Sequence, residues 1–435
     1  MKRTAFILVL CLFMLKGVLA QERPSDLVTT DIRNFWSAYD KIIATKDSAQ
    51  QYAYLHELFI AKGTPGLKAI MEARDYTARS YIDAINKYPL FWNSVRANTL
   101  KAGAFADSIA ANISKLKALY PALRPAKIYF TIGALRTGGT TMNDKVLIGS
   151  EIALGDEHTV TSEFPPAFAG LTPYFKSNPI KIVVFTNVHE YVHTQQKTTI
   201  GKNLLAQCVL EGVAEFVAEK ATGQPTTLPA LKYGNAHAEP IRNVFALQLF
   251  NPATGFWLYS NAANEFGIRD LGYYVGYAIC EKYYNSESDK KQAIKEMIEL
   301  DYNDDAALAK FVDRSGYFTR PVEELSKTYE KNRPFVTAIR PFKNNATQVD
   351  TATREITVEF SAPMDTRYRN FEMGPLGESN LLKLQSVKGF SSDGRSITFN
   401  VGLQPGRHYQ LMIGEGFRNK DGIHLKPYLL DFYTL

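Results

Sequence analysis

The chain has 435 residues, with 50 lysines and arginines against 44 acidic residues, and its formal net charge is +6 at pH 7. So small an excess of positive charge argues against a polybasic surface for nucleic acid, which is therefore not an expected partner. The length exceeds what a single hydrophobic core usually serves, so two or more domains are expected.

Residues 1–20 predict a secretory signal peptide. Lys2 and Arg3 precede an apolar run, and Val18 and Ala20 supply the small residues before a cleavage site. Lys16 breaks the run, and no later apolar stretch approaches the roughly 20 residues that span a bilayer, so no transmembrane segment is expected. We therefore expect an exported protein, periplasmic or secreted.

Residues 21–333 predict an α+β domain. In its N-terminal part, from about residue 25 to 124, apolar residues recur at spacings of three and four, which is typical of helices, and Pro65 and Pro89 break the pattern. The runs expected to form strands cover 127–132, 145–152 and 181–185. Helical patterning returns over 204–222 and 272–285. Helices around a few strands indicate a domain with a small mixed sheet.

Residues 334–435 predict a separate all-β sandwich. Short segments in which apolar and polar residues alternate are separated by Gly, Pro, Asn and Asp. The stretches FSAPMD (360–365) and LQPGRHYQLMI (403–413) resemble those of bacterial immunoglobulin-like modules. The resemblance covers the last quarter of the chain and implies a spacer, or a module that contacts a surface or another protein.

Two cysteines follow the signal peptide, Cys208 and Cys280, and each lies in apolar helical sequence. We expect two buried free thiols, because no sequence signal places the sulfur atoms within bonding distance. A disulfide between them is the alternative.

The segment TNVHEYVHTQQK, residues 186–197, carries the strongest chemical signal. His189 and His193 are four positions apart, so on a helix their rings project from one face and can share a metal ion. Glu190 lies beside that face, where a carboxylate can take a proton from metal-bound water. The spacing fits the HExxH pattern of catalytic zinc sites.

The surroundings of this motif fit a helix that follows a strand. The run 181–185 is expected to lead as a strand into the helix, and Thr186 or Asn187 is expected to cap it, since both side chains accept hydrogen bonds from backbone N–H groups. A chance match of the five-residue pattern is the alternative, and a third ligand would decide between the two.

The helix expected over 204–222 offers that ligand. Glu211 and Glu215 are one turn apart among apolar residues that favour burial. Burying a carboxylate costs several kcal/mol unless charge or hydrogen bonds offset it, and a zinc ion provides such an offset. A solvated stripe of Glu211, Glu215 and Glu219 is the alternative.

HEYVH followed by EGVAEF resembles the gluzincin metallopeptidases, in which HExxH precedes a ligand glutamate on a second helix. Leu210 stands where the aminopeptidase-like branch has asparagine. The resemblance implies a zincin-like fold for 21–333 and one zinc ion per chain. The implied roles are metal ligands for His189, His193 and Glu211, general base for Glu190, and an outer acceptor for a histidine N–H for Glu215.

Gluzincins usually add a tyrosine or histidine that stabilises the oxyanion formed when water adds to the scissile carbonyl. The Tyr-x-x-Gly pattern formed by Tyr273 and Gly276 implies Tyr273 in that role. Tyr277, one turn further along, and His237 are its rivals, and Tyr274 is not expected to contribute. Tyrosines at helical spacing are also common in protein cores.

Gly138 and Gly139 precede a predicted strand upstream of the motif. In the resembled families an edge strand beside the metal pairs with an extended substrate, which implies substrate binding by these two glycines. An ordinary hairpin is the alternative.

Together these features predict an exported zinc-dependent metallopeptidase that hydrolyses a peptide or protein substrate. Two alternatives are a catalytically inactive zincin-fold protein that serves as a binding scaffold, and a zinc hydrolase that acts on a substrate other than a peptide.

Overall fold

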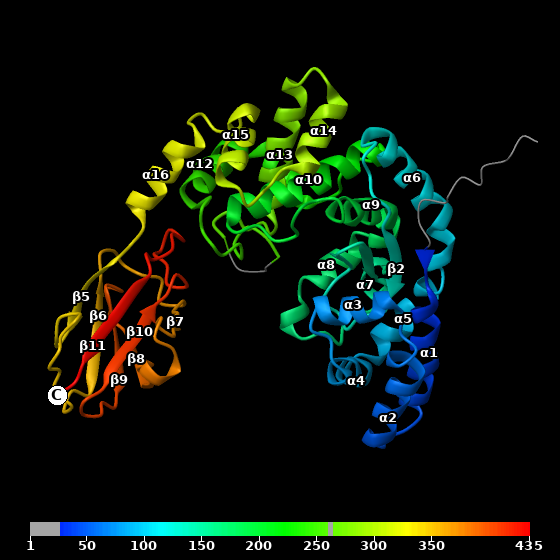
Figure 1. Cartoon of the computed structure of the whole chain (residues 1–435). Coiled ribbons are helices and arrows are strands. Elements are labelled where there is room, and N and C mark those ends of the chain that lie inside the picture. Colours follow the sequence, from blue (N-terminus) through cyan, green and yellow to red (C-terminus); the bar gives the residue numbers. More distant parts are fainter. Residues whose placement is uncertain (1–26, 260–263) are drawn as a thin grey trace, which may run out of the picture.

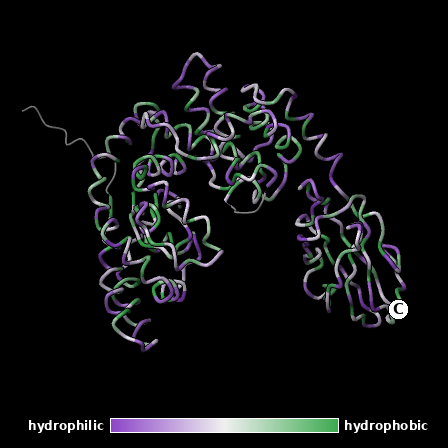
Figure 2. The backbone as a smooth tube through the Cα atoms, turned by 180° about the vertical axis from the view of Figure 1, so that it is seen from behind, coloured by the Kyte–Doolittle hydropathy of each residue, from purple (hydrophilic) through white to green (hydrophobic). Residues whose placement is uncertain are grey.

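The computed structural model describes residues 27–259 and 264–435, so the predicted signal peptide lies outside the described residues. Helices dominate the chain up to residue 332 and strands dominate after it, which confirms the expected α+β class (Figure 1). Hydrophobic and hydrophilic stretches alternate along the described residues (Figure 2). In the part of the chain that the structure describes, no helix is both long enough and apolar enough to cross a membrane.

The N-terminal part is helical, as the apolar spacing predicts. Pro65 and Pro89 occupy the first positions of two helices, where the N–H that proline lacks would have no partner within the helix. The helices are α1 (Thr30–Ile43), α2 (Ser48–Leu55), α3 (Pro65–Ala73), α4 (Ala78–Lys87), α5 (Pro89–Thr99) and α6 (Ala106–Leu119).

A small mixed sheet has the strand order β1-β2-β4-β3. Its strands are β1 (Leu27–Val28), β2 (Lys127–Thr131), β3 (Gly139–Met142) and β4 (Lys145–Gly149). The first three in that spatial order run parallel, whereas β3 is antiparallel to β4 and lies at the edge. The predicted strand over 145–152 is too long, because the chain turns after Gly149 into the short helix α7 (Ser150–Ala153).

The strand predicted over 181–185 is wrong. A 3₁₀ turn, Pro179–Ile182, leads directly into α9 (Val183–His193). Thr186 and Asn187 lie inside this helix and donate hydrogen bonds to the carbonyls of Ile182 (3.2 Å) and Val183 (2.7 Å), so the predicted capping role is also wrong. The apolar run is short and largely buried, and hydrophobic periodicity does not separate such a strand from a buried helix.

Helix α10 (Leu204–Thr222) packs against α9 and crosses a second long helix, α13 (Leu271–Ser286). Both agree with the predicted ranges to within a residue at each end. Gly212 and Gly276 meet at the crossing, where a Cβ on Gly276 would lie 1.7 Å from the carbonyl oxygen of Cys208. Only glycine fits there, so the two glycines allow a close approach of α13 to α10, the helix that carries Glu211 and Glu215. Cys208 and Cys280 are both free and buried, as predicted.

The remaining helices complete the part of the chain before residue 333. They are α8 (Leu171–Lys176), α11 (Pro229–Ala236), α12 (Ala238–Gln248), α14 (Lys290–Glu299), α15 (Asp305–Ser315) and α16 (Val322–Asn332). The buried hydrophobic residues form one cluster within 32–325 and a second within 336–432.

The C-terminal module is built from two antiparallel sheets (Figure 1). One has the order β5-β6-β9-β8 and the other β11-β10-β7. The strands are β5 (Val336–Arg340), β6 (Glu355–Phe360), β7 (Phe371–Glu372), β8 (Leu384–Phe390), β9 (Ser396–Val401), β10 (His408–Ile413) and β11 (Tyr428–Tyr433).

Candidate metal centre

Helix α9 places His189 and His193 one turn apart on a buried face. Only 8% of His189 and 7% of His193 is exposed, and their Nε2 atoms lie 3.1 Å apart. The Oε2 atom of Glu211, on α10, lies 3.5 Å from Nε2 of His189 and 3.4 Å from Nε2 of His193. These three residues form a buried group that can hold a metal ion.

The spacing of the three facing atoms can be tested against metal geometry. Two ligand atoms bound tetrahedrally at about 2 Å from one ion lie about 3.3 Å from each other. The three observed separations, 3.1, 3.4 and 3.5 Å, surround that value. Such a spacing suits three ligands of one tetrahedral ion, and a fourth position would then remain for water or substrate.

The ring nitrogen of each histidine that faces away from this group has a partner of its own. Nδ1 of His189 lies 2.9 Å from Oε2 of Glu215, and Nδ1 of His193 lies 2.6 Å from Oε1 of Gln196. Both partners are acceptors, which places a proton on each Nδ1 and leaves Nε2 as the atom that can bind a metal ion once its own proton is released. The contact of His189 with Glu215 is a close ion pair whose angle lies outside that of a hydrogen bond. Thr226 donates a short hydrogen bond to the other oxygen of Glu215.

The outer oxygen of Glu211 is also engaged. Oε1 accepts hydrogen bonds from Nε2 of Gln207 (3.3 Å) and from the hydroxyl of Tyr259 (2.5 Å). Gln207 also donates to the Tyr259 oxygen at 2.9 Å. With Oε1 held on that side, Oε2 is the oxygen that Glu211 presents to the two histidines.

Without a cation, protons on the histidines balance the charge of the buried glutamate. Burial raises the pKa of Glu211, but the charges and hydrogen bonds of His193 and His189 outweigh it and hold that pKa well below its usual value. Burial lowers the pKa of His189, yet its contacts with Glu211 and Glu215 outweigh burial and raise the pKa well above its usual value. A divalent cation bound here would displace those protons, so metal binding is coupled to proton release.

Glu190 follows His189 on α9 and is not one of the three residues of the metal group. Its side chain is partly exposed, and its Oε2 accepts a hydrogen bond of 3.1 Å from the hydroxyl of Thr141 on the edge strand β3. The Glu190 carbonyl, 2.9 Å from the same hydroxyl, shares its single proton. The charge of Glu190 acts on both histidines, so a carboxylate here, outside the ligand set, would be placed to accept a proton from water on a bound ion.

The two predicted substrate-binding glycines lie at the start of this edge strand. A Cβ on Gly139 would lie 2.7 Å from Oε1 of Glu190, so a larger residue here would displace the carboxylate from its place against the strand. Gly138 lies beside Ile152 and the hydroxyl of Tyr174. Gly139 thus lies against Glu190, whereas Gly138 lies just before the first residue of β3.

Of the predicted oxyanion donors, only Tyr273 reaches the centre. Its ring centroid lies 6.3 Å from that of His189. Burial, and then the charge of Glu211, hold the pKa of Tyr273 well above its usual value, so its hydroxyl keeps its proton. Tyr277 instead donates to Glu219 at 2.8 Å, two turns along α10 from Glu211.

The other two candidates lie away from the metal group. His237 is exposed and stacks on Tyr233 with ring centroids 4.1 Å apart. Tyr274 is buried against Gly234.

Several residues around the centre were not predicted. Gln207 precedes Glu211 by four positions on α10, so helical spacing marks it as a neighbour of that ligand, whereas Gln196 lies in the turn just after α9 and is close to His193 only in sequence. Tyr259 is separated from Glu211 by 48 positions, and no local signal in the sequence connects the two.

Comparisons with known proteins give no relative that identifies the chain. No protein family matches it, and no curated protein matches it. Among solved structures, an S-layer protein matches over 93% of this chain, with 11% sequence identity and a TM-score of 0.18. The chain spans 45% of the length of that protein. A match with so low a TM-score carries no argument about fold or function.

Proposed function

We propose that this chain is an exported zinc-dependent metallopeptidase of the gluzincin type. In this proposal residues 21–333 form a zincin-like catalytic domain and residues 334–435 an immunoglobulin-like domain. The observation that carries the proposal is the set of three ligand atoms at tetrahedral spacing, each on a residue whose outer atom is engaged elsewhere, with a free carboxylate beside them.

His189, His193 and Glu211 would hold the zinc ion, and the nitrogen and oxygen donors of this set suit it. When bound, zinc polarises a substrate carbonyl and makes a bound water acidic near neutral pH.

The chain's own residues then supply proton transfer and orientation. Glu190 accepts the proton of the attacking water on its carboxylate and later delivers it to the leaving amine. Thr141 restricts the orientation of that carboxylate by its hydrogen bond to Oε2. The Tyr273 hydroxyl donates a hydrogen bond to the oxygen that becomes negative as water adds.

Metal analysis of the purified protein, combined with cleavage of a peptide library, tests this proposal. We expect one zinc ion per chain and cleavage that stops when the metal is removed. A protein that binds no zinc would refute the proposal. A protein that binds zinc but cleaves no peptide would exclude peptidase activity and favour a non-peptide substrate or a binding scaffold.

A further inference from the structure

The first observation concerns the segment 248–259, which we call the framing segment. The carbonyls of Leu249 and Asn251 accept hydrogen bonds from the first two N–H groups of α10, on Leu205 (2.8 Å) and Leu204 (2.9 Å). These N–H groups have no partner within the helix. The framing segment therefore fixes the start of the helix that carries Glu211.

The same segment also fixes the start of α13. The carbonyl of Trp257 accepts a hydrogen bond of 2.8 Å from the N–H of Gly272, next to Tyr273. At its end, the hydroxyl of Tyr259 donates to Oε1 of Glu211. One stretch of chain thus contacts the start of α10, which carries Glu211, the start of α13, which carries Tyr273, and the Glu211 side chain itself.

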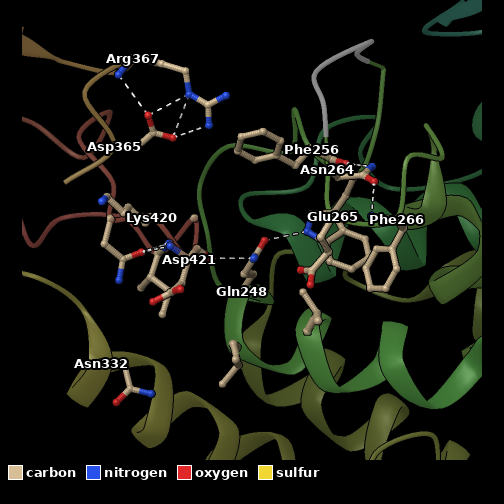
Figure 3. Close-up of a pocket in the computed structure, with 16 residues that line it drawn as sticks. Gln248, Phe256, Asn264, Glu265, Phe266, Asn332, Asp365, Arg367, Lys420 and Asp421 are labelled. Atoms are coloured by element: carbon tan, nitrogen blue, oxygen red, sulfur yellow. Dashed lines mark hydrogen bonds and ion pairs between the residues drawn. The ribbon is translucent and has the colours of Figure 1, made fainter. Parts of the chain in front are cut away.

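The opposite side of the framing segment is held by the C-terminal module. The residues of the module involved are 418–422, which we call the docking loop. Nε2 of Gln248 donates to the carbonyl of Asp421 at 2.8 Å, and Nδ2 of Asn251 donates to the carbonyl of Gly422 at 2.8 Å. Figure 3 shows Gln248 reaching across a cleft between the two parts of the chain toward Asp421.

Both amide side chains are oriented by partners on the catalytic side. Oε1 of Gln248 accepts a hydrogen bond from the indole of Trp257 (2.8 Å), and Oδ1 of Asn251 accepts one from the hydroxyl of Tyr329 (3.0 Å). The NH₂ groups must then face the module. Asn251 is only 3% exposed, so its amide would have an unpaired buried donor if the docking loop moved away.

A stacked arginine adds to this junction. Arg418 of the docking loop lies with its guanidinium carbon 4.1 Å from the ring centroid of Phe256 in the framing segment and 3.2 Å from that of Tyr368 in the module. Arg418 is 8% exposed, and cation–π contacts are strongest when they are desolvated. The module therefore contacts the framing segment both at its beginning and next to Trp257.

We propose that the C-terminal module acts as a positioning element of the metal centre, with the docking loop holding the framing segment in place and Gln248 and Asn251 as the coupling residues. The module is then an integral part of the catalytic unit and not only a spacer. The catalytic meaning of this inference rests on the proposed function, whereas the mechanical coupling does not.

The test uses a full-length double variant, Gln248→Glu with Asn251→Asp. Each substitution keeps the oxygen that accepts from Trp257 or Tyr329 and replaces the NH₂ group that donates to the module by an oxygen, which repels the carbonyl it faces. The matched control is Asn380→Asp, because Nδ2 of Asn380 also donates to a backbone carbonyl, that of His408 (3.1 Å), within the module.

Hydrogen exchange is the first readout and needs no metal. We expect the amides of Leu204, Leu205 and Gly272 to exchange faster in the double variant than in the control and the wild type. The second readout is the zinc dissociation constant from chelator competition, which we expect to rise about 2- to 30-fold in the double variant only. The visible spectrum of the cobalt(II)-substituted protein should change with it, because that spectrum responds to ligand geometry.

Unchanged exchange at these three amides in a folded double variant would overturn the inference, whatever the zinc affinity. Faster exchange with unchanged zinc affinity and spectrum would also overturn it, since the loosened frame would then not reach the ligands. A wild-type protein without zinc would refute the proposed function, and exchange alone would then decide the coupling. If the double variant does not fold, Gln248→Glu alone is measured in the same way and its result decides.

Discussion

Nδ1 of His193 lies 2.6 Å from Oε1 of Gln196, and this contact decides which nitrogen of the histidine faces the metal group. Gln196 cannot turn its amide around, because its Nε2 donates to the carbonyl of Leu210 (3.0 Å) and to the hydroxyl oxygen of Tyr302 (2.9 Å). The Tyr302 hydroxyl is itself a donor to the carbonyl of Met297 at 2.6 Å, so it can only accept from Gln196. Each donor in this chain of hydrogen bonds is therefore fixed, from the Tyr302 hydroxyl back to Nδ1 of His193, which must donate to Gln196.

Gln196→Leu should weaken zinc binding about 10- to 100-fold, the usual cost of losing an outer partner of a metal ligand. The buried Nδ1–H of His193 then has no acceptor, and the ring is free to rotate or change tautomer. Competition with a chromophoric chelator gives the affinity. Tyr302→Phe should have a smaller effect, because the Leu210 carbonyl still holds the amide of Gln196. Equal affinities of Gln196→Leu and the wild type would contradict this role.

Glu190→Gln should keep zinc and the fold but lose about 10²–10⁴-fold in kcat, because an amide cannot accept the proton of the attacking water. The substitution changes little in size, so the contact with Gly139 on the edge strand is preserved. Steady-state kinetics and metal content are measured on the same preparation. Near-normal turnover by a zinc-loaded Glu190→Gln protein would remove Glu190 as the base.

The two acids of α10 should differ in what their removal does. Glu211→Ala removes an atom that lies within 3.5 Å of both histidine nitrogens and should abolish tight zinc binding. Glu215→Ala removes only the acceptor of the His189 N–H and should weaken zinc about 10- to 100-fold. Isothermal titration of both metal-free variants with zinc ranks them, and the reverse order would transfer the ligand role to Glu215.

The metal group could be predicted from the sequence because each of its signals is local. His189 and His193 are four positions apart, and Glu211 lies in a helix whose apolar residues demand burial. Once α9 and α10 pack together, the buried Glu211 carboxylate faces the two histidines, and a cation between them would offset the cost of its burial. The α10 and α13 ranges were predicted for the same reason, since both are long segments with a regular apolar pattern.

The surroundings of the metal group depend on contacts between distant parts of the chain. Tyr259 and Tyr302 reach the centre from positions with no regular spacing to the ligands. Tyr259 is brought there by the framing segment, and Tyr302 by the turn that follows α14. The run 181–185 was misassigned because β-branched residues favour a strand locally, whereas burial against the rest of the domain decides for the helix.

Three tyrosine variants separate the role in the reaction from the role in the structure. Tyr273→Phe should lower kcat and kcat/KM together by about 10²–10³-fold with zinc content unchanged, as expected of an oxyanion donor. Tyr259→Phe should instead weaken zinc binding, because its hydroxyl holds the outer oxygen of Glu211. Tyr277→Phe, whose hydroxyl bonds to Glu219, should leave both unchanged. A loss of kcat confined to Tyr259→Phe would make that residue the donor.

Glu151 should make the stability of the catalytic part depend on pH. Its carboxyl group is fully buried at the start of α7, where Oε2 accepts the N–H of Gly133 (2.9 Å) and Oε1 that of Leu135 (3.2 Å). Burial raises the pKa of Glu151 to about 7, although these backbone hydrogen bonds oppose the shift. In the unfolded chain the same group has its ordinary pKa of 4.5.

The sign follows from proton uptake. Below pH 4.5 both states carry the proton, so Glu151 imposes no penalty there. Between pH 4.5 and about 7 the folded state keeps the proton and the unfolded state loses it, so the free energy of unfolding falls as the pH rises, by about 3 kcal/mol in total.

Glu151→Gln cannot titrate and should lack this contribution. Denaturant unfolding of both proteins, with a chelator present to exclude metal effects, measures the difference at each pH. Trp36, Trp92 and Trp257 all precede residue 334, and Trp36 and Trp92 lie in the N-terminal helices, so tryptophan fluorescence chiefly follows the unfolding of this part of the chain. A difference between wild type and variant that stays constant from pH 4.5 to 8 would show that Glu151 does not titrate in that range.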